Sequence, residues 1–534
     1  MARLALSARA SAAMIVVATT ALAWVASGVV ARRALAARVP AVADLRGSPA
    51  PAAEAIREAD ADVRRAPSAA TIGALAQAYH AGLLPGAAVE SYGLAAALDD
   101  GDGRWPYLQA VLLEERNDAA ADESLQRAAN AGGGAGYVWY RLAERAFKQR
   151  RLDDAQTAYV RAAEAPAVAA FRPAGVTARQ TWPLSAYAAV GLARVALERG
   201  QRDEAARRLR QVTASYPGFG PARTWRRVVE RRGATRPSGS SEPSAPSGPS
   251  GSSASANPPA AADAPYVPPA DPALDAVVAS SRHSDLLLKH AGVAARGGDA
   301  AWREFLVRRA LQFNPADLNV LMEMAAMLQA TGRPAEALPY LTTHEQLAPG
   351  DHHALVEHGQ VLADLGRLPE AEAVLRRAVV VRDAAAEYNL GTVLDRQGRW
   401  QEARARYERA IAINPFHARA MNNLGAGLDQ RGDAAGLAWF ERALAAAPDT
   451  AEVHVNYGSA LLRLKRFADA VTTLTTAIAL APRDANAHSN LGIALASMGD
   501  LARARDAFAQ ALAIDPGHAN ARGNLAQVTA ALAR

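Results

Sequence analysis

Small and apolar residues recur along the C-terminal half of the chain with a period close to 34 residues. In residues 384–417, small residues stand at repeat positions 8, 20 and 27, as Gly391, Ala403 and Ala410, and Pro415 stands at position 32. Small residues let two helices approach closely, and proline ends a helix because it lacks an amide hydrogen. The pattern therefore predicts two antiparallel helices per repeat, a first helix A and a second helix B.

The same frame occurs seven times in succession. The repeats begin at Ser284, Leu318, His352, Ala384, Ala418, Ala451 and Ala485. The repeat from Ala418 lacks one residue in the turn between its two helices. Residues 519–534 start like another helix A and then stop, which predicts a capping helix that covers the last apolar face.

A weaker form of the frame is present in the N-terminal half. It fits best from Ala186, where Leu192, Ala193 and Gly200 stand at the expected places, and it also fits from residues 69, 102 and 136. We therefore expect a helical domain of three or four similar repeats over residues 47–232.

The segment between the two halves has a different composition. Residues 233–272 are mostly Ser, Pro, Gly and Ala and carry almost no large apolar side chains. Such a segment buries too little surface to offset its ordering entropy, so we expect a disordered linker, either inserted into one long array or joining two independent arrays. The expected organisation is an N-terminal segment (1–46), a helical domain (47–232), the linker (233–272), a seven-repeat array (273–518) and the capping helix (519–534).

These residue classes at these positions, with a period near 34, resemble the tetratricopeptide repeat (TPR) family. The resemblance implies an all-α fold in which helix pairs stack into an α-solenoid, a superhelix, here in two arrays. It also implies that the helices A line the concave surface of each array.

The N-terminal segment predicts a membrane-associated helix. Residues 10–31 contain no charge, and about 20 apolar residues can span a bilayer. We favour an uncleaved transmembrane anchor, with a cleaved signal peptide as the alternative. Both flanks are positive, with Arg3 and Arg9 before the segment and Arg32, Arg33 and Arg38 after it, so the charges do not decide the orientation. We expect a bacterial inner-membrane protein with its repeats in the periplasm; a secreted periplasmic form and a cytoplasm-facing form are the alternatives.

Composition narrows the class of function further. The chain has no cysteine, which excludes disulfides, thiolate metal sites and cysteine nucleophiles. Its formal net charge is +6, and residues 1–46 alone hold six Arg against one Asp. The basic character therefore belongs mostly to the predicted membrane segment, and we predict no nucleic-acid partner.

The sequence carries no recognisable catalytic constellation. It contains no P-loop and no nucleophile elbow, and its carboxylates follow the repeat period. His352, His353 and His358 form the one histidine cluster, but their spacings differ from the i, i+4 pair that zinc prefers on a helix. We therefore predict no enzyme, no catalytic residue, no cofactor and no metal site, and we assign these histidines to the surface and to contacts between repeats.

One polar residue recurs at repeat position 6. Asn389, Asn423, Asn456, Asn490 and Asn524 follow one another at spacings of 34, 33, 34 and 34 residues. An amide side chain both donates and accepts hydrogen bonds, so a row of them suits an extended peptide backbone. The row is similar to the asparagine ladder in the TPR superhelix of the O-linked N-acetylglucosamine transferases, although the catalytic domain of those enzymes is missing here.

The row has two interpretations. In the first, it is a peptide-binding surface, to which Arg396 and Arg463 at position 13 add positive charge, as basic residues do in the TPR domains that clamp a peptide carboxylate. Alternatively, the asparagines are a consensus feature that bridges neighbouring helices. The three preceding repeats carry Lys289, Glu323 and Glu357 at position 6, so the fold itself does not require asparagine there.

The sequence thus predicts a non-enzymatic TPR scaffold that binds a protein or peptide partner in its concave groove over about residues 384–534. The alternative is a structural assembly factor for an envelope complex that uses the outer faces of both arrays. The oligomeric state and the role of the N-terminal repeats are not determined by the sequence.

Overall fold

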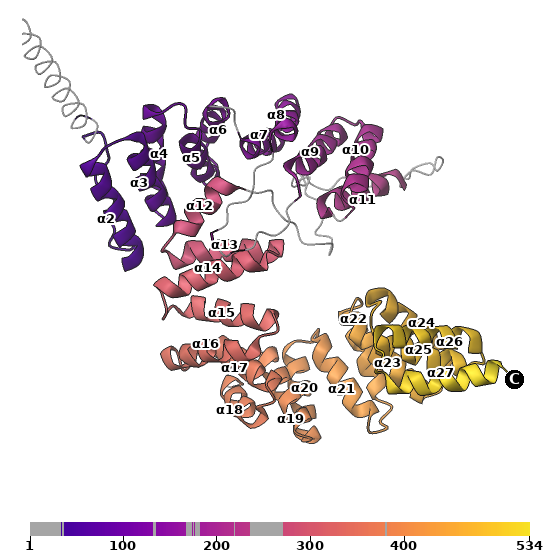
Figure 1. Cartoon of the computed structure of the whole chain (residues 1–534). Helices are drawn as coiled ribbons and strands as arrows, with labels where there is room; N and C mark the ends of the chain where they lie inside the picture. Colours follow the sequence, from indigo (N-terminus) through magenta and orange to yellow (C-terminus); the bar gives the residue numbers. More distant parts are fainter. Residues whose placement is uncertain are drawn as a thin grey trace, which may run out of the picture. The chain divides into compact units, whose positions relative to one another are not determined.

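The computed structural model describes residue 34 and residues 37–131, 135–166, 173–174, 176, 182–217, 219–234, 271–379 and 382–533. These residues form helices α2 to α27 and contain no strand (Figure 1). They fall into two compact units, here called unit 1, which ends at Glu323, and unit 2, which begins at Met324. The boundary lies inside α15 (Leu318–Ala330).

Unit 1 holds all the helices that precede α15. They are α2 (Ala50–Arg65), α3 (Ala69–Ala81), α4 (Pro85–Leu98), α5 (Arg104–Glu115), α6 (Ala120–Asn130), α7 (Gly136–Lys148), α8 (Leu152–Glu164), α9 (Leu184–Glu198), α10 (Arg202–Ser215), α11 (Gly220–Ala234), α12 (Pro272–Ser280), α13 (Ser284–Gly297) and α14 (Ala300–Phe313). Of the predicted linker 233–272, residues 235–270 lie outside the described part of the chain.

Unit 2 continues the same alternation of helices A and B. It contains α16 (Pro334–Leu347), α17 (His352–Asp364), α18 (Leu368–Ala378), α19 (Ala384–Arg396), α20 (Trp400–Ile413), α21 (Ala418–Asp429), α22 (Gly436–Ala446), α23 (Ala451–Arg463), α24 (Phe467–Leu480), α25 (Ala485–Ser497), α26 (Leu501–Ile514) and α27 (Ala519–Leu532). The helices A of successive repeats contact one another, as α21 does α23, α23 does α25 and α25 does α27.

The helix boundaries follow the repeat frame closely. In the seven C-terminal repeats and the capping helix, each helix A starts at the first residue of the frame, from Ser284 to Ala519. In the repeat from Ala418, which lacks a turn residue, α22 starts late and spans only Gly436–Ala446. Among the described helices, three have no counterpart in the frames: α2 before the first repeat, α11 after the repeat from Ala186, and the short α12 before α13.

The repeat from Ala384 shows why these residues form a helix pair. Asp383 caps α19 by accepting hydrogen bonds from the backbone amides of Ala385 and Ala386. Gly398 turns the chain with φ +77°, a conformation that glycine adopts without strain. Gly391 then lets α19 lie against the ring of Tyr407 on α20, because a Cβ atom there would stand 2.8 Å from the ring.

Each unit has its own buried core. In unit 1, one cluster includes Ile72, Tyr79 and Leu108 from the N-terminal repeats, and it also contains Val277 of α12 and Leu286 of α13. In unit 2, the largest cluster includes Trp400 and Phe440, among others. The first C-terminal repeat therefore packs with the N-terminal helices, which places the unit boundary inside α15 rather than at residues 233–272.

The predicted membrane segment at residues 10–31 lies outside the described residues. Among the helices that are described, none combines the length and the apolar character needed to cross a bilayer. Anchoring by residues 10–31 therefore stays a prediction from the sequence.

Candidate functional site

The five asparagines at position 6, here called the asparagine row, all lie on helices A of unit 2. They come from α19, α21, α23, α25 and α27, one residue before the leucine or tyrosine of position 7. All five side chains are half-buried. They therefore stand at the edge of the core, where a side chain can reach either a neighbouring helix or a bound segment.

Two members of the row bridge neighbouring repeats. The amide of Asn456 donates a hydrogen bond to Oδ1 of Asn422, at 3.1 Å, on the preceding helix A. The amide of Asn490 donates to Oγ of Ser459, at 2.7 Å, again on the preceding helix A. These two asparagines thus serve the structural role that the sequence left open as an alternative.

Asn422 is a member of this network that the sequence analysis missed. Its side chain is 3% exposed and donates to Oδ1 of Asn423, at 3.4 Å, and to Oε1 of Glu452, at 3.3 Å. A buried amide needs such partners because an unpaired polar group in a core costs free energy. The signal was the Asn422-Asn423 doublet, which no other repeat of the row contains.

The two ends of the row behave differently from its middle. Neither Asn389 nor Asn524 has a hydrogen-bond partner among the described residues, whereas Asn423 receives the long contact from Asn422 and also interacts with the hydroxyl of Tyr407. A second half-buried polar group, Asp395 of α19, also has no partner there. Burial raises the pKa of Asp395, and the charge of Arg431 lowers it in part. The helices A of unit 2 therefore carry unpaired amides at both ends of the row, and α19 carries a half-buried carboxylate about 120° round the helix from Asn389.

The two arginines proposed beside the row are engaged with the repeat before them. Arg396 donates to the carbonyl of Ala363 in the last turn of α17, at 2.7 Å. Arg463 forms an ion pair with Asp429 at the end of α21, where Nε lies 3.2 Å from Oδ1. Both place positive charge at the carboxyl end of a helix, which the helix dipole favours. Both are exposed enough to contact a ligand as well, but neither is a free cation.

The histidine cluster of α17 separates in space. Nε2 of His352 lies 2.9 Å from Asp383, whereas Nδ1 of His358 lies 2.7 Å from Glu345, and His353 is exposed. The described residues contain no group of three or more side chains arranged to hold a metal ion. The carboxylate partners lie on neighbouring elements, so His352 and His358 link repeats.

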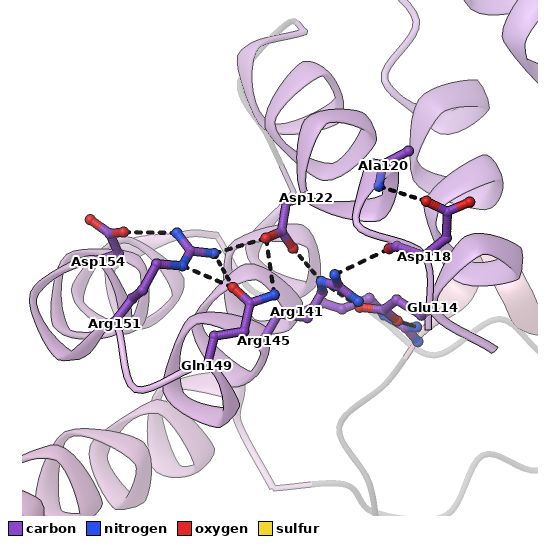
Figure 2. A network of polar contacts seen from close by, with 9 residues as sticks. All are labelled: Glu114, Asp118, Ala120, Asp122, Arg141, Arg145, Gln149, Arg151 and Asp154. Carbon is purple, nitrogen blue, oxygen red and sulfur yellow. Dashed lines mark hydrogen bonds and ion pairs between the residues drawn. The ribbon is translucent and has the colours of Figure 1, made fainter. Parts of the chain in front are cut away.

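A second polar network lies in unit 1, between the repeats built from α5–α6 and α7–α8 (Figure 2). Asp122 of α6 accepts hydrogen bonds from Arg145, from Gln149 at 3.1 Å and from Arg151 at 2.9 Å. Burial raises the pKa of Asp122, but the bonds from Arg145 and Gln149 outweigh that effect and lower it. The arginines of this network are therefore used in joining repeats.

Comparison with solved structures finds helical-repeat proteins. A tetratricopeptide repeat protein of Parabacteroides merdae has 15% identity and a TM-score of 0.38, with 46% of this chain and 98% of that chain covered. The Cut9–Hcn1 hetero-tetramer of the APC/C has 14% identity and a TM-score of 0.39, with coverage of 85% and 95%. PilF of Pseudomonas aeruginosa has 19% identity and a TM-score of 0.36, with coverage of 39% and 97%.

Among curated proteins, a short stretch is similar to the probable biofilm formation methyltransferase WspC of Pseudomonas aeruginosa. The identity is 42% over 77 residues, which is 14% of this chain. The chain covers only 18% of that relative's length.

Models of the tetratricopeptide repeat match the chain at residues 187–218 and 351–415, and again at 388–451, 428–474 and 456–519. The matches fall on the helix pairs described above, with the same helix boundaries and the same small residues between the helices. The matched segments, residues 187–218 and 351–519, are therefore tetratricopeptide repeats.

Proposed function

We propose that unit 2 binds an extended peptide segment of a partner protein along its helix A face, and that the chain acts as a non-enzymatic scaffold. Tetratricopeptide repeats are, in general, protein-interaction modules. The observation that supports the specific proposal is the division of the asparagine row, in which Asn456 and Asn490 bridge repeats while Asn389 and Asn524 keep unpaired amides on the same face.

An amide side chain fits a peptide backbone because it can donate to a carbonyl and accept from an N–H group of the same residue. The half-buried position of the row holds each amide in place, so less side-chain entropy is lost on binding. Helices in contact are about 8–10 Å apart, so the five helices A from α19 to α27 extend over roughly 32–40 Å. An extended segment of about ten to twelve residues has that length.

Binding of this kind is weakly selective for sequence, because the asparagines contact backbone groups that all peptides share. Selectivity would come from charged groups beside the row, in particular the exposed arginines Arg396 and Arg463.

The proposal is tested with twelve-residue peptides selected by display on the full-length chain. For a selected binder, we expect the double variant Asn389→Ala/Asn524→Ala to lose about 1–3 kcal/mol of binding free energy, since each lost hydrogen bond contributes about 0.5–1.5 kcal/mol. That loss corresponds to an increase in Kd of about 5- to 150-fold, measured by isothermal titration calorimetry.

Asn520→Ala is the matched control, because Asn520 is an exposed asparagine on the same capping helix but at position 2. It should leave Kd unchanged. If both variants bind every selected peptide as tightly as the parent chain, the row is not the binding surface, and the outer faces of the helices become the better candidate.

The similarity to a probable methyltransferase does not change this proposal. It spans 77 residues and leaves most of that relative without a counterpart in this chain. We therefore propose a role in binding and no methyl transfer.

A further inference from the structure

Helix α12 lies against the helices A of the N-terminal repeats, within unit 1 (Figure 1). It contacts α3 and α5, the helices A of two successive repeats, and α13 follows directly after it. It is nine residues long, so it crosses these helices as a short separate segment. Residues 235–270 separate it from α11.

The first residue of the segment, Asp271, is held by two side chains of the N-terminal repeats. Tyr107 of α5 donates its hydroxyl to Oδ2 of Asp271 at 2.5 Å, and Arg141 of α7 donates to the same oxygen at 3.1 Å. The other oxygen of Asp271 accepts from the backbone amide of Leu274 and so caps α12. One carboxylate therefore both starts the helix and binds it to two repeats.

The surroundings of Asp271 are built for a carboxylate. Tyr107 is 1% exposed, and the side chain of Arg141 is 28% exposed. Arg141 also donates to Glu114 at 2.5 Å (Figure 2). Its guanidinium lies 5.5 Å from the centroid of the Tyr107 ring. The ring of Tyr137 packs edge-on against that of Tyr107, with centroids 4.8 Å apart. In the frames that start at residues 102 and 136, Tyr107 and Arg141 both stand at position 6, the position of the asparagine row.

The rest of the segment is apolar, and a hydrogen bond holds its C-terminal end as well. Val277 and Val278 of α12 are fully buried, and Val277 belongs to the same core as Ile72 and Leu108. Beyond the helix, Oγ of Ser281 donates to the carbonyl of Ala81 at the end of α3, at 2.7 Å. The segment 271–281 is thus anchored by a carboxylate at one end, two valines in the middle and a hydroxyl at the other end.

A helix of nine residues is not stable by itself in water, because nucleation costs more than so few hydrogen bonds return. The order of α12 therefore comes from the surface that it covers. These are the properties of a short recognition segment that folds when it binds, combined here with its receptor in one chain.

We propose that the helix A face of α3, α5 and α7 is a docking site for a short apolar helix capped by an aspartate. The segment 271–281 is its resident occupant, and a partner helix with the same cap and the same apolar spacing displaces it. The site differs from the asparagine row in its ligand chemistry, since a guanidinium and a phenol bind a carboxylate whereas amides bind a backbone.

Thiol labelling of the full-length chain tests whether the segment opens. The chain has no cysteine, so a single introduced cysteine reports on one position. In Val278→Cys, we expect labelling at least tenfold faster than in Ala110→Cys, which is equally buried but lies within α5. Equal labelling rates would show that the segment opens only with the whole unit, and would overturn the proposal.

A synthetic peptide of residues 270–283 tests the chemistry of the occupant. Added in excess to Val278→Cys, it should speed labelling at least threefold, because it captures the opened site. The Asp271→Ser peptide keeps a capping side chain but lacks the carboxylate, and it should need at least a tenfold higher concentration for the same effect. The Ser280→Ala peptide, changed at an exposed position, should act like the parent peptide.

The chain variant Arg141→Gln tests whether the guanidinium recognises the carboxylate. If it does, Val278→Cys should be labelled faster in this variant without peptide, and the parent and Asp271→Ser peptides should act alike on it. The proposal fails if the peptides have no effect on labelling, or if the parent and Asp271→Ser peptides act alike on the unaltered chain.

Discussion

Repeat position 6 has different side chains and different partners in the two units. In unit 1, Tyr107 and Arg141 stand there and hold Asp271, while Lys289 at the same position pairs with Glu115 at 2.8 Å. In unit 2, the position carries Glu357 in α17 and asparagines from α19 onward, of which Asn456 and Asn490 bridge repeats and Asn389 and Asn524 lack partners. One position on one kind of helix therefore serves either to hold a charged segment or to offer amides, and the side chain decides which.

The comparison also supports the functional proposal for unit 2. Unit 1 shows, within the same chain, that the helix A face at position 6 is accessible to a segment that crosses successive repeats. The asparagine row occupies the equivalent place in its own repeats.

The largest expected difference between the units is in their response to acid. Burial lowers the pKa of His80 and of His290 to about 4, and both rings lie in unit 1. The groups that face His80 are Tyr92 on α4, Glu115 on α5, and Lys289 and His290 on α13. An unfolded histidine titrates near pH 6.5, so as the pH falls protons bind the unfolded chain first and stability falls between pH 6.5 and about 4.

Between pH 6.5 and 5, each histidine should remove about 1.5 kcal/mol from the free energy of unfolding of unit 1, or about 3 kcal/mol together. Hydrogen exchange at pH 6.5 and 5 would measure this loss for each unit. In unit 2, burial lowers the pKa of His417 as well, so a smaller loss is expected there. The double variant His80→Gln/His290→Gln should abolish the greater loss of stability of unit 1 relative to unit 2. If the difference between the units persists, these two rings are not its cause.

Removal of Arg141 should have the next largest effect. Arg141→Leu would leave Asp271 without its cation and Glu114 with only Arg145, 3.9 Å away, and both carboxylates are less than one-fifth exposed. Breaking a buried pair costs about 3–5 kcal/mol, and the partial exposure of Arg141 reduces this to about 2–4 kcal/mol in denaturant unfolding of unit 1. Arg104→Leu, which breaks the more exposed pair with Asp102, is the control and should cost less than about 1 kcal/mol. Equal losses would mean that Arg141 is an ordinary surface residue.

The smallest effects should separate the members of the asparagine row. Asn456→Ala and Asn490→Ala each remove one hydrogen bond between repeats and should cost about 0.5–1.5 kcal/mol of unfolding free energy. Asn389→Ala and Asn524→Ala should change stability by less than about 0.5 kcal/mol. Chemical denaturation followed by circular dichroism would resolve the two classes, and an equal cost at all four positions would remove the distinction on which the peptide-binding proposal rests.

Local periodicity predicted most of the fold. The frame located the start of every helix A from Ser284 to Ala519, because small residues, caps and the helix-ending prolines repeat within each unit of sequence. It did not find α12, since nine residues outside any repeat have no period. Nor did it find the contacts of Asp271 with Tyr107 and Arg141, which join residues 164 and 130 positions apart in the chain.

The candidate site was predicted only in part. The spacing placed five asparagines on one side of the helices A, but the partners of Asn456 and Asn490 depend on which small polar residues lie on the preceding helix. Asn422 and Ser459 occupy different repeat positions, 5 and 9, so no single periodic pattern contains both. The free carboxylate of Asp395 likewise depends on burial in three dimensions, which the sequence pattern does not supply.

The contact between Arg141 and Asp271 has a consequence for the synthesis of the protein. A ribosome adds about 5–20 residues per second, so Asp271 is made about 6–26 s after Arg141. During most of that interval α3, α5 and α7 have been synthesised but Asp271 has not, so their acceptor for a carboxylate is empty. A chaperone or an early partner that carries an aspartate-capped apolar helix therefore meets the site before the segment 271–281 can fill it.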